Sequence, residues 1–150
     1  MVIVGADGFI GSAVVRAALG ARMEVTAISL KAPWRLRDVC SARLADVRVD
    51  GGRWWLPERD LSLTSALREA DSVALLAYTP PAPEEKRKLQ HERAVNVRGA
   101  KAVAEIAGST GARLVFTSSA DVYGPWREDP VCEAARAQPA SPYAVAKIEA

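Results

Sequence analysis

Short apolar runs alternate with amphipathic stretches along the whole chain, beginning with the run Val-Ile-Val at residues 2–4. This first run is too short for a helix, and it leads directly into glycines at positions 5, 8 and 11. The residues that follow are rich in alanine and leucine at helical spacing, which predicts a helix from about residue 8 to 19 that stops at Gly20. The start of the chain therefore predicts a buried strand, a glycine turn and a helix.

Four further strands are predicted by the apolar pattern. Residues 24–28 supply the second strand, and either 45–49 or 53–56 supplies the third. Residues 72–78 form a continuous apolar run, which is typical of a parallel strand covered on both faces, and residues 112–117 predict a fifth strand. Strands that alternate with helices predict an α/β fold with a doubly wound parallel sheet, a Rossmann fold.

Three helices are predicted after the second strand. Ser62 is expected to cap a short helix that ends near residue 70. A long helix is expected over residues 84–107, where the apolar stripe fits one face imperfectly and indicates a break near Gly99. The last helix is expected to start near Ser141 or Pro142 and to run to the end of the sequence.

The three glycines of the first turn indicate a dinucleotide-binding site. Gly5 allows the chain to reverse sharply, and the missing side chain at Gly8 lets backbone N–H groups approach a pyrophosphate. Gly11 lets the helix lie close to the strand, and the helix N-terminus adds partial positive charge that faces the phosphates. The spacing is G-x-x-G-x-x-G rather than the commoner G-x-G-x-x-G, so an ordinary strand-turn-helix is the alternative.

The end of the second strand bears on the choice between NAD and NADP. Folds of this kind that prefer NAD usually carry an acidic residue there, which holds the hydroxyls of the adenosine ribose. This sequence has Ser29, Leu30 and Lys31 at that point, with Arg35 and Arg37 following. Because no carboxylate is available and cations are near enough to meet a 2′-phosphate, the segment leans slightly towards NADP, with NAD as the alternative.

A serine, a tyrosine and a lysine are candidates for catalysis. Ser118 and Ser119 follow the fifth strand, so their hydroxyls lie at the carboxyl edge of the sheet, where open α/β sheets bind ligands. Tyr143 and Lys147 are spaced i and i+4 and share one helix face. A neighbouring ammonium stabilises a phenolate, as a general acid/base at neutral pH requires, while a serine hydroxyl can hold the substrate oxygen. A nicotinamide ring would take or give the hydride.

The composition is that of an ordinary soluble protein of one domain. The 150 residues are 49% hydrophobic and 25% charged, with a net charge of +2 and no basic stripe, so neither nucleic acid nor a membrane surface is expected as a partner. No apolar run reaches membrane-spanning length, and no signal peptide precedes the first strand. Cys40, Cys132 and the single histidine, His91, form no ligand motif, so we expect reduced thiols, no metal site and a cytoplasmic location.

In combination, these motifs resemble those of the extended short-chain dehydrogenase/reductase family, in its NAD-dependent epimerase/dehydratase group, which acts largely on nucleotide sugars. The segments that carry the resemblance are residues 5–11, 60–61, 75–78, 96–100, 115–124 and 141–147. They are similar to the family's glycine motif, adenine-side acid, strand-four motif, long-helix motif and two active-site motifs. In the strand-four motif, Leu75 replaces the usual histidine and Tyr78 replaces the usual second alanine.

The resemblance implies an NAD(P)-dependent oxidoreductase or epimerase, which acts on a nucleotide sugar by 4-epimerisation or keto reduction, and it is compatible with a homodimer. It implies that Ser119 polarises the substrate oxygen, that Tyr143 transfers the proton, and that Lys147 binds the nicotinamide ribose and tunes Tyr143. The cofactor-binding residues that it implies are Gly5, Gly8, Phe9, Ile10, Gly11, Ser29, Lys31, Asp60, Leu61, Leu76, Ala77, Tyr78, Asn96, Tyr143 and Lys147.

Two departures from the family pattern limit the implied function. The dehydratase branch follows its active-site hydroxyl with an Asp-Glu pair that eliminates water, whereas this chain has Ala120 and Asp121, so dehydration is disfavoured. The sequence also ends at Ala150, before the last strands and the substrate-binding region, so about half of the expected protein is absent. The sequence is then either a fragment or a truncated product, and the alternative function is a non-catalytic dinucleotide-binding module or an inactive remnant.

Overall fold

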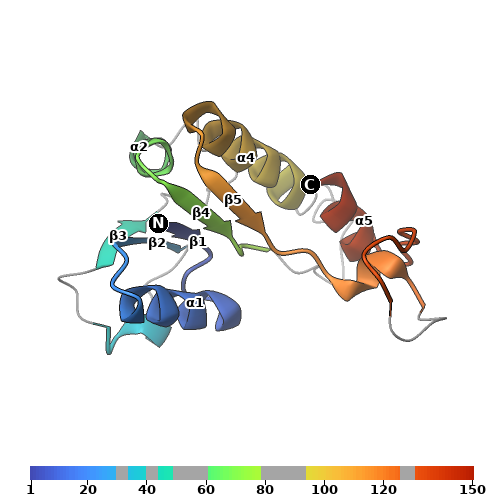
Figure 1. Ribbon diagram of the computed structural model, residues 1–150, viewed down its shortest axis with the longest axis horizontal. Coiled ribbons are helices and arrows are strands. Elements are labelled where there is room, and N and C mark those ends of the chain that lie inside the picture. The colour runs from blue at the N-terminus through green and yellow to red at the C-terminus, as the bar shows by residue number, and fades with distance from the viewer. Residues whose placement is uncertain (30–33, 40–43, 49–60, 79–93, 126–130) are drawn as a thin grey trace.

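The fold is built on a five-stranded sheet in which every strand pair is parallel (Figure 1). The structure is a computed structural model that describes residues 1–29, 34–39, 44–48, 61–78, 94–125 and 131–150. The strands, in the spatial order β3-β2-β1-β4-β5, are β3 (Leu44–Arg48), β2 (Val25–Ser29), β1 (Val2–Val4), β4 (Ser72–Leu75) and β5 (Arg113–Phe116). The expected doubly wound parallel sheet is confirmed.

The order of the strands reverses next to β1, which pairs with β2 on one side and with β4 on the other. In sheets of this kind a crevice opens outside the carboxyl ends of the strands at the point of reversal, and dinucleotides bind there. Gly5 follows β1 and Leu76 follows β4, so both segments lie at the carboxyl ends of the strands on the two sides of this reversal. The topology alone therefore places the glycine turn opposite the segment that contains Tyr78.

Helices cover both faces of the sheet, as Figure 1 shows with α1 on one side and α2 and α4 on the other. Alternate residues of β1 point to opposite faces: Val2 and Val4 pack in one cluster and Ile3 in another. The first cluster includes Leu63 and Leu67 of α2 (Leu61–Arg68) and Val103 of α4 (Gly99–Thr110). The second includes Val15 of α1 (Phe9–Gly20) and Leu36 of the short 3-10 helix η1 (Trp34–Leu36).

The long helix has the expected break. The π-helical turn η5 (Ala94–Arg98) ends where α4 begins at Gly99, and such turns commonly occur at functional sites. The helix runs to Thr110, beyond the expected end near residue 107, because the left-handed cap is Gly111, with φ 74°, and not Gly108. The expected first part of this helix, before Ala94, lies outside the described residues.

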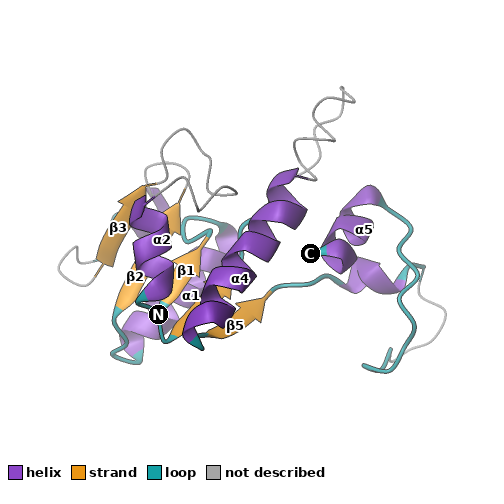
Figure 2. Cartoon of the chain, turned by 90° about the horizontal axis from the view of Figure 1, so that it is seen from above, coloured by secondary structure: helices purple, strands orange, loops and turns teal. Residues whose placement is uncertain are grey.

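The last helix, α5 (Pro142–Glu149), begins where the sequence predicts. The Ser141 hydroxyl accepts a hydrogen bond from the Ala144 N–H at 3.1 Å, and Pro142 occupies the first turn. Helix α5 packs against η5 and against η6 (Ala120–Tyr123), a 3-10 turn that follows β5. Figures 1 and 2 both show α5 beyond the end of β5, at the carboxyl edge of the sheet.

Other expectations need correction. Ser62 does not cap α2, because the helix already includes Leu61 and Ser62 lies within its first turn. Strand β4 ends at Leu75 rather than at Tyr78, since its partner β1 ends at Val4, where the chain turns away. The third strand is the first of the two candidate segments.

Several expectations fall on residues outside the described ranges, namely those for Lys31, Cys40, residues 53–56, Asp60 and His91. Cys132 is described and is a free, exposed thiol. Within the described ranges, no helix has both the length and the apolar character needed to cross a membrane.

Candidate functional site

The glycine turn has the geometry that a dinucleotide site requires. Gly5 has φ +92°, a left-handed conformation that side chains oppose, and its N–H donates to the Ile28 carbonyl at 2.9 Å. A Cβ at Gly5 would lie 2.7 Å from the backbone nitrogen of Ala77. The glycine turn and the segment after β4 therefore lie in direct backbone contact, and two of the motifs expected to hold the cofactor are brought together.

Gly8 and Gly11 close the turn onto the start of α1. Gly8 precedes the helix, and its N–H donates to the Gly5 carbonyl at 3.1 Å. Gly11 is buried, and a Cβ there would overlap the Gly5 carbonyl oxygen. Gly11 was predicted to let the helix lie close to the strand, and the backbone that it meets is instead that of the turn after the strand, at Gly5 and Ala6.

The N-terminus of α1 is suited to binding an anion. No described side chain caps it, and its first turn contains no acidic residue. Phe9 and Ile10, at its first two positions, are 86% and 57% exposed. Because first-turn N–H groups carry partial positive charge and have no partner within the helix, they can bind a diphosphate. The closely packed glycine cradle and the open helix end fit a bound dinucleotide.

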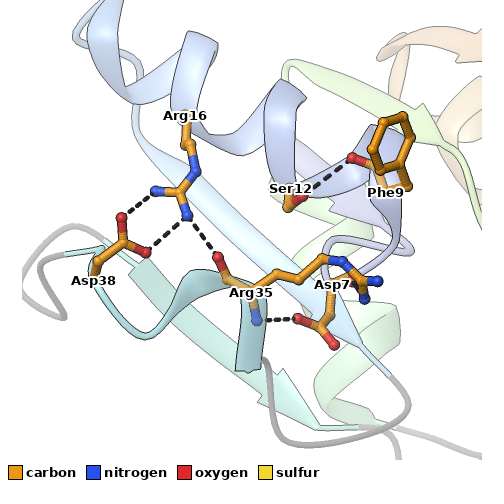
Figure 3. Close-up of polar contacts among 6 residues, drawn as sticks. All are labelled: Asp7, Phe9, Ser12, Arg16, Arg35 and Asp38. Carbon is orange, nitrogen blue, oxygen red and sulfur yellow. Dashed lines mark hydrogen bonds and ion pairs between the residues drawn. The ribbon is translucent and has the colours of Figure 1, made fainter.

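Asp7, within the glycine turn, is tied to the segment after β2 (Figure 3). Its Oδ1 accepts a hydrogen bond from the Arg35 backbone N–H at 2.9 Å. The Arg35 guanidinium in turn donates through Nη1 to the Asp7 carbonyl at 3.2 Å. These contacts fix the approach of η1 to the turn that would hold the diphosphate.

A second tie joins α1 to the same segment. Arg16 donates two hydrogen bonds of 2.7 Å to the Asp38 carboxylate and a third, of 2.5 Å, to the Arg35 carbonyl (Figure 3). The hydrogen bond from Arg16 lowers the pKa of Asp38 from its usual value. Asp38 is therefore engaged by a bidentate arginine, and both side chains remain accessible to solvent.

The other residues predicted to bind the cofactor lie at several places in the fold. Ser29 is buried at the end of β2, and Asn96 is buried in η5, which packs against α5. Leu61 is 84% exposed at the start of α2. Leu76 continues from β4 and donates its N–H to the Val4 carbonyl at 2.9 Å, which holds the segment beside the glycine turn. The structure does not describe Lys31 and Asp60.

Lys147 is held at the carboxyl end of β5. Its side chain is 8% exposed, and Nζ donates to the Thr117 carbonyl at 2.8 Å. Burial lowers the pKa of the ammonium from its usual value. Nζ also lies 4.7 Å from the centroid of the Phe116 ring and 5.1 Å from that of the Tyr78 ring. The lysine is thus anchored to the strand that leads to the candidate serine.

Tyr143 is half-buried, and its ring meets the Tyr78 ring edge-on, with centroids 4.6 Å apart and planes at 79°. The Ser119 hydroxyl, at the start of η6, accepts a hydrogen bond from the Asp121 N–H at 3.3 Å. Within the described ranges no hydrogen bond joins Ser119 to Tyr143. The structure therefore brings Tyr143 and Lys147 to the end of β5, and Ser119 lies two residues beyond the carbonyl that holds the lysine.

The sequence did not predict the contacts that three residues make with the Tyr143–Lys147 helix. Tyr78 was expected only as a cofactor residue, and Phe116 and Thr117 only as parts of a strand and a motif. Their contacts with α5 join segments far apart in the chain, which local patterns do not reveal. One signal was present in the sequence: an aromatic ring at Tyr78 replaces the alanine that is usual at that position of the resembled motif.

The family comparison agrees with this geometry. The model of the NAD dependent epimerase/dehydratase family matches residues 1–150. The chain belongs to this family. The resemblance inferred from the motifs is therefore confirmed.

Solved structures of similar fold include enzymes of nucleotide-sugar chemistry. UDP-N-acetylglucosamine 4-epimerase from Methanobrevibacter ruminantium M1 is 26% identical with a TM-score of 0.81, and the match covers 98% of this chain and 46% of that one. MoeE5, in complex with UDP-glucose and NAD, is 27% identical with a TM-score of 0.76, covering 99% and 45%. UDP-glucose-4-epimerase from Stenotrophomonas maltophila, with bound NAD, is 22% identical with a TM-score of 0.81, covering 98% and 45%.

The chain spans less than half the length of these solved structures. No curated protein sequence matches the chain at a significant level.

Proposed function

We propose that the full-length protein is an NAD(P)-dependent epimerase or keto reductase that acts on a nucleotide sugar. The observation that carries the proposal is the position of Lys147, whose ammonium is held by the Thr117 carbonyl at the end of β5. This contact brings α5, with Tyr143, to the same edge of the sheet as the glycine turn. The phenol proposed to transfer the proton and the helix end proposed to bind the diphosphate then lie at one edge of the sheet, as hydride transfer between a bound dinucleotide and a sugar requires.

In the proposed reaction, Tyr143, Lys147 and Ser119 have separate roles. Tyr143 takes or gives the proton of the sugar hydroxyl at the reacting carbon, and Lys147 binds the nicotinamide ribose and supplies positive charge near the phenol. The Ser119 hydroxyl accepts from the Asp121 N–H and has no acceptor for its own proton among the described residues, so it can donate to the substrate oxygen. A bound nicotinamide would supply the hydride chemistry, which is removal and return of a hydride in epimerisation and transfer of a hydride from the reduced cofactor to the sugar in keto reduction.

The substrate class is inferred from the neighbours. Two of the solved structures more than 25% identical carry UDP-linked ligands, UDP-N-acetylmuramic acid in one and UDP-glucose in the other. Since Ala120 and Asp121 replace the acidic pair of the dehydratase branch, the proposal favours 4-epimerisation or keto reduction over dehydration.

For the cofactor, the residues after β2 favour NADP slightly. Ser29 ends the strand, Lys31 follows, and the Asp38 carboxylate is engaged by Arg16. The solved structures of similar fold favour NAD instead, since MoeE5 and the Stenotrophomonas maltophila epimerase both have NAD bound. Either cofactor would place its diphosphate on the N-terminus of α1.

Titration of the full-length protein with NADH and NADPH tests the cofactor proposal, and incubation with UDP-glucose or UDP-N-acetylglucosamine tests the chemistry. We expect micromolar binding of at least one reduced cofactor, followed by nicotinamide ring fluorescence. We also expect a change in the sugar, followed by NMR. Binding without any turnover would favour the alternative, a non-catalytic dinucleotide-binding module, and absence of binding would contradict both.

The tie between Asp7 and Arg35 predicts an effect on cofactor affinity. Asp7→Ala removes the acceptor of the Arg35 N–H and should weaken binding of the reduced cofactor by about fivefold, which corresponds to one hydrogen bond of about 1 kcal/mol. Asp7→Asn keeps an oxygen at the same position and should stay within about twofold of the unchanged protein. Equal losses in the two variants would show that the carboxylate charge matters and that the hydrogen bond does not.

A further inference from the structure

Tyr78 contacts both members of the candidate proton-transfer pair at once. Its ring meets Tyr143 edge-on at 4.6 Å, and the Lys147 ammonium lies 5.1 Å from its centroid. Tyr78 belongs to the segment after β4, whereas Tyr143 and Lys147 belong to α5. A single ring therefore bridges the sheet edge and the helix.

The surroundings of the Lys147 ammonium explain why such a ring matters. One N–H donates to the Thr117 carbonyl, and the rings of Phe116 and Tyr78 lie close to the same Nζ. The side chain is 8% exposed, so solvent contributes little to stabilising the charge. The negative faces of aromatic rings attract a cation, and this attraction offsets part of the cost of burial.

The edge-on contact acts on Tyr143 in a different way. Aromatic pairs prefer this perpendicular arrangement, and a ring packed against the phenol restricts the rotation of its side chain. An alanine at position 78, as in the resembled motif, would have neither the length nor the π-face to make these contacts. The tyrosine at this position is therefore a feature of this chain that the family pattern does not require.

We propose that Tyr78 is a positioning residue for Tyr143 and Lys147: its ring fixes the orientation of the phenol and holds the charged ammonium beside the Thr117 carbonyl. The inference rests on the proposed function, because it assigns Tyr78 a role towards the residues that would move the proton and bind the nicotinamide ribose. The ring carries the role through its shape and its π-face.

The pKa of Lys147 can be measured as a test, and the titratable and charged groups near its ammonium decide how the result is interpreted. Among the described residues, the groups with contacts at Nζ are the titratable Tyr78 from the segment after β4 and the uncharged Phe116 and Thr117. Tyr143 lies four residues before Lys147 on the same helix face. The turn η6, which packs against α5, brings exposed Asp121 and half-buried Tyr123. The turn η5, which also packs against α5, brings buried Asn96, and its charged end, Arg98, is exposed. On its own helix, Glu149 lies two residues further on and is half-buried.

The test compares Tyr78→Leu with Tyr78→Phe in the full-length protein, because both keep an apolar side chain and only phenylalanine keeps a ring. The Lys147 amine is titrated by NMR without cofactor or substrate, its signal assigned by its loss in Lys147→Gln. We expect the leucine variant to titrate about half a pH unit lower than the phenylalanine variant, because it loses the attraction of the ring for the charged form. If leucine prevents folding, Tyr78→Met makes the same exchange of a ring for an aliphatic chain.

Steady-state kinetics provide the second readout. Tyr78→Leu should lower kcat by about tenfold or more with a change in cofactor KM of less than about threefold, because a misplaced acid/base affects the chemical step. Tyr78→Phe should recover most of that loss. Equal Lys147 titrations and equal kcat values in the two variants would overturn the proposal. Absence of turnover in the unchanged protein, with the titration difference intact, would instead count against the proposed function.

Discussion

Replacement of Tyr143 by phenylalanine is expected to lower turnover of a nucleotide sugar by about 10²–10⁴-fold, which is the range contributed by a positioned general acid or base. The substitution removes only the phenolic hydroxyl. The ring that packs edge-on against Tyr78 remains, so Lys147 keeps its surroundings and α5 keeps its contacts. Affinity for the reduced cofactor should change by less than about threefold. The measurements are kcat in the full-length protein and a fluorescence titration with the cofactor.

Tyr123→Phe is the matched control for this variant. Tyr123 is half-buried at the end of η6, and its side chain has no hydrogen bond or ring contact within the described ranges. Removal of its hydroxyl should change turnover by less than about threefold. Retention of turnover in Tyr143→Phe would end the assignment of Tyr143 as the proton-transferring group. A similar loss in both variants would indicate a general effect of phenols at this edge of the sheet.

Much of the fold could be predicted because its signals are local. The run at Val2–Val4, the glycines after it and the helical pattern that follows lie within 20 residues, and each has one physical interpretation. Ser141 before Pro142 likewise marks a helix start on its own. The break near Gly99 could be predicted because the apolar positions of the long helix fit one face only imperfectly.

Element ends were less predictable because distant partners determine them. The apolar run after Ser72 continues to Tyr78, but strand β4 ends at Leu75, since β1 beside it ends at Val4. The long helix was expected to end near residue 107, but it continues to Thr110, because the residue that adopts the left-handed conformation and ends it is Gly111. Neither the end of β4 nor the end of α4 can be read from the local sequence pattern.

In the candidate site, too, local features could be predicted from the sequence, whereas contacts between distant segments could not. The spacing of Tyr143 and Lys147 could be interpreted on its own, because i and i+4 share a helix face whatever the tertiary structure. The contact of Lys147 with the Thr117 carbonyl and with the Tyr78 ring depends on how α5 docks at the sheet edge. The same holds for the hydrogen bond between Asp7 and the Arg35 N–H. Contacts that close long loops need the whole topology before they can be predicted.

Gly11→Ala is expected to have a large effect on both stability and cofactor binding. The added Cβ would overlap the Gly5 carbonyl oxygen, and that carbonyl cannot easily retreat. Gly5 is held by its hydrogen bond to the Ile28 carbonyl and by its close approach to the backbone of Ala77. Helix α1 must therefore move away from the turn. Overpacking of this kind costs about 1–3 kcal/mol of the free energy of unfolding, and we expect a loss of cofactor affinity of about tenfold or more.

Gly20→Ala provides the control within the same helix. Gly20 is the last residue of α1, and a Cβ there meets no atom within 4 Å. Since alanine favours helix more than glycine by up to about 1 kcal/mol, this variant should be as stable as the unchanged protein or more so, with unchanged cofactor affinity. Urea denaturation without cofactor and titration with NADH and NADPH measure the two effects separately. A Gly11→Ala variant as stable as Gly20→Ala would mean that α1 does not rest on the glycine turn. A destabilised Gly11→Ala variant that still binds the cofactor normally would place the diphosphate somewhere other than the first turn of α1.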